Sequence, residues 1–392
     1  MKKILLLFVC LFTISFAKAQ QNQITTGVPF LLVAADARAA GMADNGVATS
    51  ADAFSQQWNP AKYAFALDQQ GFSVSYTPYL TDLVNDISLG QLTYYNRLNE
   101  KSAFAGSIRY FSLGNIELRQ TGDINEIANI VKPSEFAFDG SYSLKLSEKF
   151  SMAVAGRFIS SNLGLTTDGQ SLSAAKSFAV DVAGFFQSEE VAYSDFNGRW
   201  RAGFNFQNMG PKINYDLSQS DNGSNFLPAN LKIGTGFDFI LDDYNKVALN
   251  VEFNKLLVPT PQTVVDLNND GVVDGTDSAI NNTNYTSIGW FQGINQSFSD
   301  GPGGFSEELK EITYSVGAEY LYQDSFAMRM GYFHESPDKG ARKFFSLGAG
   351  FKYNVVKVDV SYLFSAGKAK NPLENTLRFS LTFNFGDKYE EY

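Results

Sequence analysis

The sequence predicts an all-β fold, a transmembrane β-barrel of 14 antiparallel strands with a small N-terminal plug. Three observations predict it: an export signal begins the chain, about fourteen segments alternate between apolar and polar residues, and the last segment can close a barrel. In that segment, Asn375 to Phe385, five large apolar residues alternate with Arg378 and other polar ones. An extended strand places the two kinds on opposite faces. A last strand that pairs with the first leaves no open edge, as a membrane barrel requires.

Residues 1–19 form the expected secretory signal. Two lysines precede an apolar run from Ile4 to Phe16, and the sequence A-K-A ending at Ala19 fits a cleavage site. We therefore expect the mature chain to begin at Gln20. The single cysteine lies inside the signal, so the mature protein has neither thiol nor disulfide.

Composition narrows the classes of function. The chain has 31 basic and 41 acidic residues, so nucleic acid is not an expected partner, because phosphate binding needs clustered Lys and Arg. No segment after the signal approaches the roughly 18–20 consecutive apolar residues of a spanning helix. Aromatic residues make up 15% of the chain and there are 33 glycines, which suits a barrel in the outer membrane of a Gram-negative bacterium.

Residues 20–70 do not alternate and are rich in alanine. Small residues pack closely in a confined space, so we interpret this region as a plug, or hatch, folded into the barrel lumen. A surface cap or a periplasmic arm is the alternative. The Asn59-Pro60-Ala61 step is the candidate plug motif, because proline fixes its own φ and restricts the residue before it.

Fourteen strand-like segments fill the barrel region, residues 71–386. The second is the weakest, because Leu92 and Tyr94 fall out of phase with Ile87 and Leu89. The expected strands are 72–79, 86–97, 102–113, 135–147, 150–163, 176–190, 199–209, 230–242, 245–257, 309–322, 325–335, 343–354, 355–366 and 375–386.

The connections between these strands alternate in length. Those after even-numbered strands are mostly short, whereas those after odd-numbered strands include the long segments 114–134, 164–175, 210–229 and 258–308. Short periplasmic turns and long extracellular loops are the usual asymmetry of such barrels, with both termini in the periplasm. The acidic tail 387–392 follows the closing strand.

The polar strand faces carry charges of both signs, among them Arg109, Arg157, Asp139 and Asp181. Buried ions persist only when they are paired or hydrated. We therefore expect the polar face to line the lumen and the apolar face to meet outer-membrane lipid. A soluble sandwich would instead bury the apolar face.

A calcium loop is the clearest candidate metal site. Residues 266–277 place oxygen ligands at loop positions 1, 3, 5, 9 and 12, a backbone carbonyl at position 7 and glycine at position 6. Position 12 is Asp rather than the usual Glu. The alternative is a solvated acidic loop with Asn-Asp-Gly turn chemistry. The candidate Ca²⁺ ligands are Asp266, Asn268, Asp270, Val272, Asp274 and Asp277.

The rest of the long loop 258–308 is unusually apolar for a segment in water. Exposed aromatic clusters tend to mark partner sites, and a lid packed on its own barrel mouth is the equal alternative. The candidate partner-binding residues are Trp290, Phe291, Ile294, Phe298 and Phe305.

We predict that the protein is not an enzyme. His334 is the only histidine, and G-x-S-x-G, H-E-x-x-H and G-x-x-x-x-G-K-[ST] do not occur. A barrel phospholipase would need a Ser and a His paired at the lipid boundary.

The N-terminal segment from Gly27 through Pro29-Phe30 to Ala43, followed by Asp52-Ala53 and by Trp58-Asn59-Pro60-Ala61, forms a recognisable pattern. It resembles the PorV family of Bacteroidetes outer-membrane proteins, relatives of the FadL long-chain fatty acid transporters that share the Asn-Pro-Ala step before a fourteen-stranded barrel. The resemblance covers nearly the whole mature chain. The calcium-like loop and the acidic tail lie outside the pattern.

The resemblance implies an outer-membrane component of the type IX secretion system. Such proteins bind the C-terminal signal domains of exported cargo, associate with the SprA translocon and deliver cargo to the PorU-containing attachment complex. The competing hypothesis is a FadL-like transporter of hydrophobic small molecules. The charges on the inward face favour docking, because a fatty-acid route should be lined by apolar groups.

Overall fold

The computed structural model describes residues 23–81, 83–119, 128–164, 166–167, 170–171, 173–215, 224–367 and 371–389. The expected signal peptide and the last three residues of the acidic tail lie outside this part of the chain. No helix among the described residues is long and apolar enough to span a membrane.

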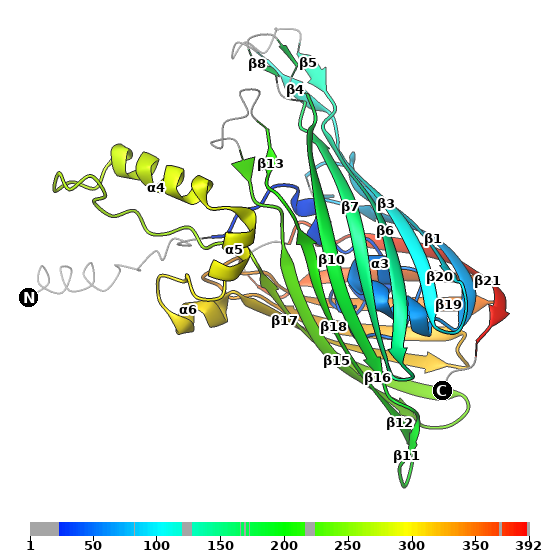
Figure 1. Cartoon of the computed structure of the whole chain (residues 1–392). Helices are drawn as coiled ribbons and strands as arrows, with labels where there is room; N and C mark the ends of the chain where they lie inside the picture. Colours follow the sequence, from blue (N-terminus) through cyan, green and yellow to red (C-terminus); the bar gives the residue numbers. More distant parts are fainter. Residues whose placement is uncertain are drawn as a thin grey trace, which may run out of the picture.

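Within the described chain, fourteen strands form a closed antiparallel barrel (Figure 1), which confirms the predicted fold. Each strand pairs with the next strand of the barrel along the chain, and β1 pairs with β21 to close the ring, with Phe72 opposite Phe383. The barrel strands are β1 (Asp68–Pro78), β2 (Ile87–Arg97), β3 (Ser102–Leu113), β6 (Ser134–Ser147), β7 (Phe150–Asn162), β10 (Ala175–Gln187), β12 (Asn197–Met209), β15 (Asn230–Ile240), β16 (Asn245–Leu256), β17 (Ile312–Tyr322), β18 (Phe326–His334), β19 (Lys343–Tyr353), β20 (Val356–Ser365) and β21 (Leu377–Lys388).

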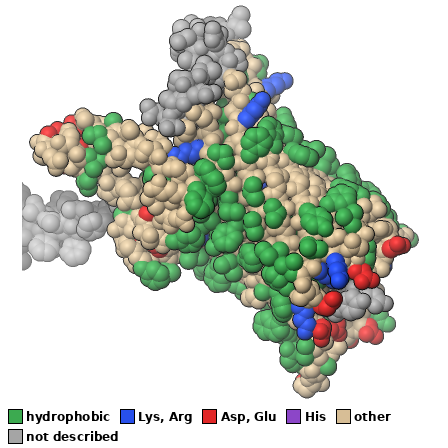
Figure 2. Space-filling view, in the orientation of Figure 1, with side chains coloured by type: hydrophobic (Ala, Val, Ile, Leu, Met, Phe, Trp, Pro, Cys, Tyr) green, Lys and Arg blue, Asp and Glu red, His purple; other side chains and the backbone are tan. Residues whose placement is uncertain are grey.

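The two faces of the barrel wall differ as the alternation predicts. In β21, Phe379 points outward with 47% of its surface exposed, while its neighbour Arg378 points inward and is 1% exposed. Figure 2 shows apolar side chains spread over the barrel strands on this face, with charged side chains gathered near the short-turn end. Such a wide apolar surface is incompatible with water and fits lipid.

The structure accounts for the irregular alternation of apolar residues in β2. Leu89 points inward, is fully buried and belongs to an apolar cluster with Phe30 and Phe111, whereas Leu92 points outward and is exposed. The apolar phase changes along this strand because the lumen is apolar near the loop end and polar farther down.

The long connections gather at one end of the barrel and carry short elements of their own (Figure 1). The connection between β16 and β17 contains the three helices α4 (Gly275–Ser287), α5 (Trp290–Gln296) and α6 (Phe305–Lys310). The short strands outside the barrel ring are β4 (Ile116–Leu118), β5 (Asn129–Val131), β8 (Thr166–Thr167), β9 (Gln170–Ser171), β11 (Val191–Ala192), β13 (Ile213–Asn214) and β14 (Ser224–Asn225).

The N-terminal segment fills the lumen as a plug. It contains the 3-10 helices η1 (Pro29–Leu32) and η2 (Pro60–Phe65) and the one-turn helices α2 (Ala37–Ala40) and α3 (Ser55–Trp58). Small residues allow it to touch the wall closely: a Cβ on Gly41 would lie 3.0 Å from the Cα of Gly348 in β19. A larger residue at this contact would force the plug away from the strand.

The plug enters from the loop end of the barrel, not from the short-turn end. The Gly27 N–H donates to the Phe226 carbonyl beside β14, 2.9 Å away, whereas the Ala61 carbonyl at the other end of the plug accepts from Ser151 at the start of β7. The first described residues therefore lie at the loop end, which corrects the expectation that both termini share the short-turn side. The C-terminal strand ends at the short-turn side as expected (Figure 1).

Candidate docking surface and plugged lumen

The predicted plug motif sits deep in the lumen and is buried at all three positions. Asn59 caps η2, because its side-chain oxygen accepts from the Ala61 N–H at 3.0 Å. Its side-chain nitrogen donates to the carbonyls of Val47 (2.9 Å) and Gly184 (3.0 Å), which joins two parts of the plug to the barrel wall. Pro60 opens the 3-10 helix at a position where its fixed φ is favourable.

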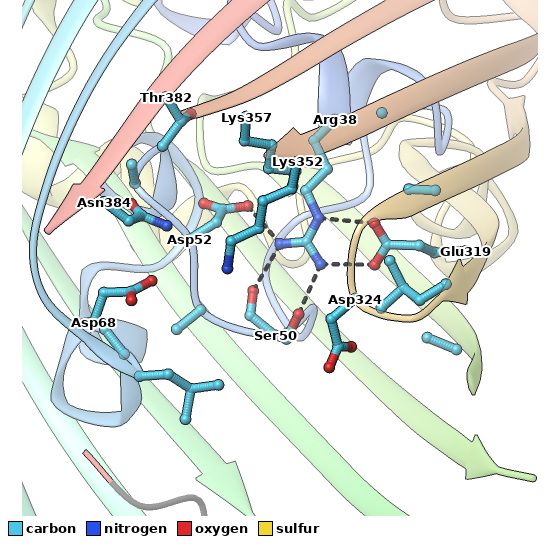
Figure 3. A pocket seen from close by; sticks show the side chains of 18 of the residues that line it. Arg38, Ser50, Asp52, Asp68, Glu319, Asp324, Lys352, Lys357, Thr382 and Asn384 are labelled. Carbon is cyan, nitrogen blue, oxygen red and sulfur yellow. Dashed lines mark hydrogen bonds and ion pairs between the residues drawn. The ribbon is translucent and has the colours of Figure 1, made fainter. Parts of the chain in front are cut away.

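Arg38 is the central anchor of the plug (Figure 3). Its guanidinium donates to both carboxylate oxygens of Glu319 in β17, at 3.1 and 2.8 Å, and to Asp52 and Ser50 of the plug. Such a bidentate pair fixes orientation as well as distance. Sequence reasoning placed Arg38 in the family pattern but did not single it out as a structural residue.

Several of the inward charges predicted for the lumen form ion pairs, whereas Arg109 donates to the Leu31 carbonyl of the plug at 3.0 Å. Arg157 contacts Asp139 (3.2 Å) and Asp181 (2.9 Å), and Lys232 contacts Glu252 at 3.1 Å. Glu252 also accepts from the backbone N–H groups of the plug at Gly46 and Val47, both at 2.8 Å. The ion pairs thus join neighbouring strands and attach the plug to them.

The loop-end half of the lumen is apolar but occupied. Val28, Phe30 and Leu31 of the plug pack there against wall residues that include Leu89 and Ile159. The rings of Phe30 and Phe111 stack with centroids 6.0 Å apart. Any hydrophobic ligand entering this region would have to displace plug side chains.

The long loop is fixed to the barrel mouth by ion pairs below α6. Lys255 at the end of β16 contacts Glu308 (2.9 Å) and Glu311 (2.6 Å), and Lys339 contacts Glu307 (2.8 Å) and Glu311 (2.9 Å). Burial works against ionisation of Glu311, but hydrogen bonds from Lys255, Thr260 and Lys339 lower its pKa below the ordinary value. The carboxylate therefore stays charged at neutral pH.

The predicted partner-binding residues lie on α5, α6 and the segment between them. Phe291 and Phe305 are 65% and 78% exposed, Trp290 and Phe298 are exposed as well, and Ile294 is half-buried. Trp290 and Phe291 touch, with ring centroids 5.7 Å apart, and among the described residues no ring contact joins Phe298 or Phe305 to them. The five residues therefore share one loop surface without forming one cluster.

Leu309 belongs to the same surface, and sequence reasoning missed it. It lies one helical turn after Phe305 on α6 and is also exposed. The i, i+4 spacing could have revealed it, because such pairs share one side of a helix. We call the exposed apolar side chains of α5, α6 and the segment between them the docking surface.

The predicted calcium loop has calcium-loop backbone geometry but uses its carboxylates internally. Gly271 has φ +87°, as position 6 requires, and Asp266 accepts the N–H groups of Asp270 (3.2 Å) and Gly271 (2.8 Å). Asp277 accepts from the Leu267 N–H at 2.7 Å, and its pKa is lowered by hydrogen bonds from backbone N–H groups, foremost that of Asp274.

The remaining candidate ligands serve the same internal geometry. Asp274 is the N-cap of α4 and forms a capping box with Asp277, while Asn268 donates to Asp270 at 2.8 Å and Val272 is exposed.

The carboxylates that do converge lie elsewhere in the loop. Across the described residues, the acidic group whose oxygen atoms gather within 4.8 Å is Asp300, Glu308 and Glu311. Lys255 contacts two of these three, so the cluster already holds a cation of the protein's own. Lys255 therefore takes the place that a metal ion would occupy in this cluster, and calcium binding at 266–277 stays a prediction.

Comparison with protein families gives one decisive match. The family model described as type IX secretion system protein PorV matches residues 16–263, more than half of the chain. This chain belongs to the PorV family. No curated protein sequence matches it.

Solved structures agree with the fold of this PorV-family protein. The toluene transporter TodX of Pseudomonas putida has a TM-score of 0.50 at 12% identity, with 92% of this chain and 98% of TodX covered. The toluene transporter TbuX of Ralstonia pickettii has a TM-score of 0.49 at 12% identity, with 91% of this chain and 100% of TbuX covered. A Pseudomonas aeruginosa FadL homologue has a TM-score of 0.44 at 14% identity, with 91% of this chain and 99% of the homologue covered. At such an identity the likeness to TodX shows the barrel fold alone.

Proposed function

We propose that this protein is a docking barrel of the type IX secretion system, in the outer membrane of a Gram-negative bacterium. It receives the C-terminal signal domains of exported cargo at its loop end, beside an SprA-type translocon, and passes the cargo to a PorU-type attachment complex. The observation that carries the proposal is the docking surface: exposed apolar side chains on a loop that ion pairs hold to the barrel mouth.

The fixed position of the loop supports recognition rather than a mobile lid. Two lysines from β16 and from the β18–β19 connection bind the acidic side of α6, so α6 is oriented before any partner arrives. Pre-orientation lowers the conformational entropy lost on binding. Aromatic side chains on such a surface are the usual anchors of protein interfaces.

The lumen disfavours the alternative, transport of hydrophobic small molecules. Its apolar half is filled by Val28, Phe30 and Leu31, and the cavity at its other end is lined by charged groups such as Arg38 and Glu319. A route for an apolar ligand needs apolar walls and an exit.

The test is co-purification from cells of a type IX-secreting bacterium. Replacing Phe291, Phe298 and Phe305 with Ser removes three anchors, and we expect co-purified translocon and cargo to fall at least about tenfold while the barrel still folds. Deleting residues 288–305 should have the same effect.

The matched control replaces Ile116 and Ile130 with Ser. These residues are exposed apolar side chains of the β4–β5 hairpin, another loop at the same end of the barrel. Co-purification should persist in this control. Unchanged co-purification in the triple-Ser variant would remove the docking role from this surface, and bound lipid without any protein partner would favour the transporter.

A further inference from the structure

A polar cavity of about 420 Å³ lies at the short-turn end of the lumen, below the plug and opposite to the docking surface (Figure 3). Its walls include Leu67, Ser325 and Tyr389, which lie where strands meet the short turns, so the cavity extends to the rim of that end. The volume is within the range of about 300–1,000 Å³ that small-molecule sites occupy.

Most charged groups of the cavity are satisfied inside the protein. Arg38 binds Asp52 and Glu319, Arg201 binds Asp238, and Lys246 contacts Asp324. These pairs stabilise the wall and leave little net charge to attract a ligand.

Lys352, Asp68 and Lys388 line the same cavity and are not used in this way, and Lys388 of β21 lies opposite Asp68 in the strand register. Among the described residues, neither Lys352 in β19 nor Asp68 in β1 has a side-chain hydrogen bond or ion pair. Figure 3 shows both side chains directed into the cavity. An uncompensated charge in a partly enclosed site is costly unless water or a ligand compensates it.

The surroundings of Lys352 strengthen this observation. Lys352 lies directly opposite Lys357 in β20, which contacts Asp359 at 3.5 Å and also faces the carboxylates of Glu319 and Asp52. Two like charges at opposed positions of neighbouring strands repel each other. An anionic group placed between them would relieve the repulsion.

A strip of polar side chains connects the positive and negative ends. Thr382 and Asn384 of β21, the strand between β20 and β1, also line the cavity. The side-chain oxygen of Asn384 is buried without a hydrogen-bond partner. This atom is turned toward Gly71 of β1 and away from solvent, so a ligand in the cavity does not reach it.

We propose that this cavity binds a small zwitterion, with its anionic group at Lys352 and Lys357 and its ammonium at Asp68. The ligand would enter from the short-turn side. This site is independent of the proposed docking function, because the two lie at opposite ends of the barrel.

The experiment is calorimetric titration of the detergent-solubilised mature protein at low ionic strength. Triglycine carries the ammonium, the carboxylate and the amides, and N-acetyl-triglycine amide is the same peptide without charges. Phosphorylethanolamine distinguishes a lipid headgroup from a peptide as the source of the zwitterion. We expect one of the two zwitterions to bind and the capped peptide not to bind.

Substitutions test which side chain binds each charged end of the ligand. Lys352→Gln and Asp68→Asn should each weaken binding about tenfold or more, the effect of losing one charged hydrogen bond. Lys352→Arg should restore it, and Lys101→Gln, an exposed lysine in the β2–β3 turn, should leave it unchanged. Migration before and after boiling verifies that each variant is folded.

Three outcomes would overturn the proposal. They are no binding of either zwitterion by the wild type at millimolar concentration, equal binding of the capped peptide, and binding that survives both Lys352→Gln and Asp68→Asn.

Discussion

At the scale of single residues, charged hydrogen bonds attach the plug to the barrel wall. Arg38 connects the plug residues Asp52 and Ser50 with the wall residue Glu319; its contact with Glu319 is buried, and those with Asp52 and Ser50 are partly buried. Around Arg38 the lumen is polar but is not a water-filled channel, because protein side chains take the place of water as hydrogen-bond partners.

The first prediction concerns this anchor. Arg38→Met leaves Asp52 without its ion pair and removes the bond between the plug and Glu319, which keeps Arg329 at 2.7 Å, so the barrel should lose about 3–5 kcal/mol of unfolding free energy. Urea titration of the barrel in detergent, followed by gel mobility without boiling, measures the loss. Lys246→Gln breaks an exposed ion pair with Asp324 and should cost no more than about 1 kcal/mol. Equal losses of unfolding free energy in the two variants would contradict the role of Arg38 as the anchor of the plug.

At the scale of elements, α6 is a short helix that could not persist alone in water, since isolated helices of this length are unstable. Its position comes from Lys255 and Lys339, which bind the carboxylates of Glu307, Glu308 and Glu311. The docking surface therefore depends on the ionisation of these carboxylates.

The second prediction follows from the lowered pKa of Glu311. A group whose pKa is lowered by folding stabilises the fold above its unfolded value, about 4.3 for Glu, and loses this effect as the pH falls through the folded value. Hydrogen exchange of residues 300–311 should accelerate as the pH falls below about 4.3, after correction for intrinsic exchange rates.

The matching variant is Glu311→Gln. It should exchange faster already at neutral pH and depend less on pH, because the titrating group is gone. Protection that is equal in the wild type and the variant at all pH values would show that other contacts hold α6.

The third prediction concerns the loop 266–277. We propose that it binds Ca²⁺ at millimolar concentration, with Asp266 and Asp270 turning from backbone N–H groups to the ion. Calorimetry should detect binding by the wild type and none by the variant with Asp266→Ala and Asp270→Ala. Asp195→Ala removes an exposed acid of a short turn and is the control. No heat with the wild type would exclude the site.

At the scale of the whole molecule, lipid contact and the closed ring determine stability together. The outward residues of β21 face lipid along the seam where the two ends of the sheet meet. A barrel without a free edge satisfies its strand hydrogen bonds internally, as lipid requires.

The fourth prediction tests the membrane position of this seam. Leu381 lies in the middle of β21, opposite Val74 and Val358, whereas Phe385 lies toward the short-turn end. Leu381→Arg should cost about 2–4 kcal/mol of folding free energy in lipid vesicles, and Phe385→Arg about 0–1 kcal/mol. Reversible unfolding titrations in vesicles measure both, and a larger cost at Phe385 would place the membrane differently.

The sequence by itself determined the barrel, because alternation with period two assigns each residue to lipid or lumen without knowledge of its neighbours. It therefore placed the fourteen strands within a few residues, and the Asn-Pro-Ala step pointed to the family.

The tertiary structure alone decided what the lumen holds. The strand pairings and the path of the plug bring Arg38 to Glu319 and Leu89 to Phe30. It also decided that the plug enters from the loop end and that Asp277 serves a backbone turn. These contacts join residues far apart in the chain, and their register comes from closing the whole sheet around the plug, which no local pattern encodes.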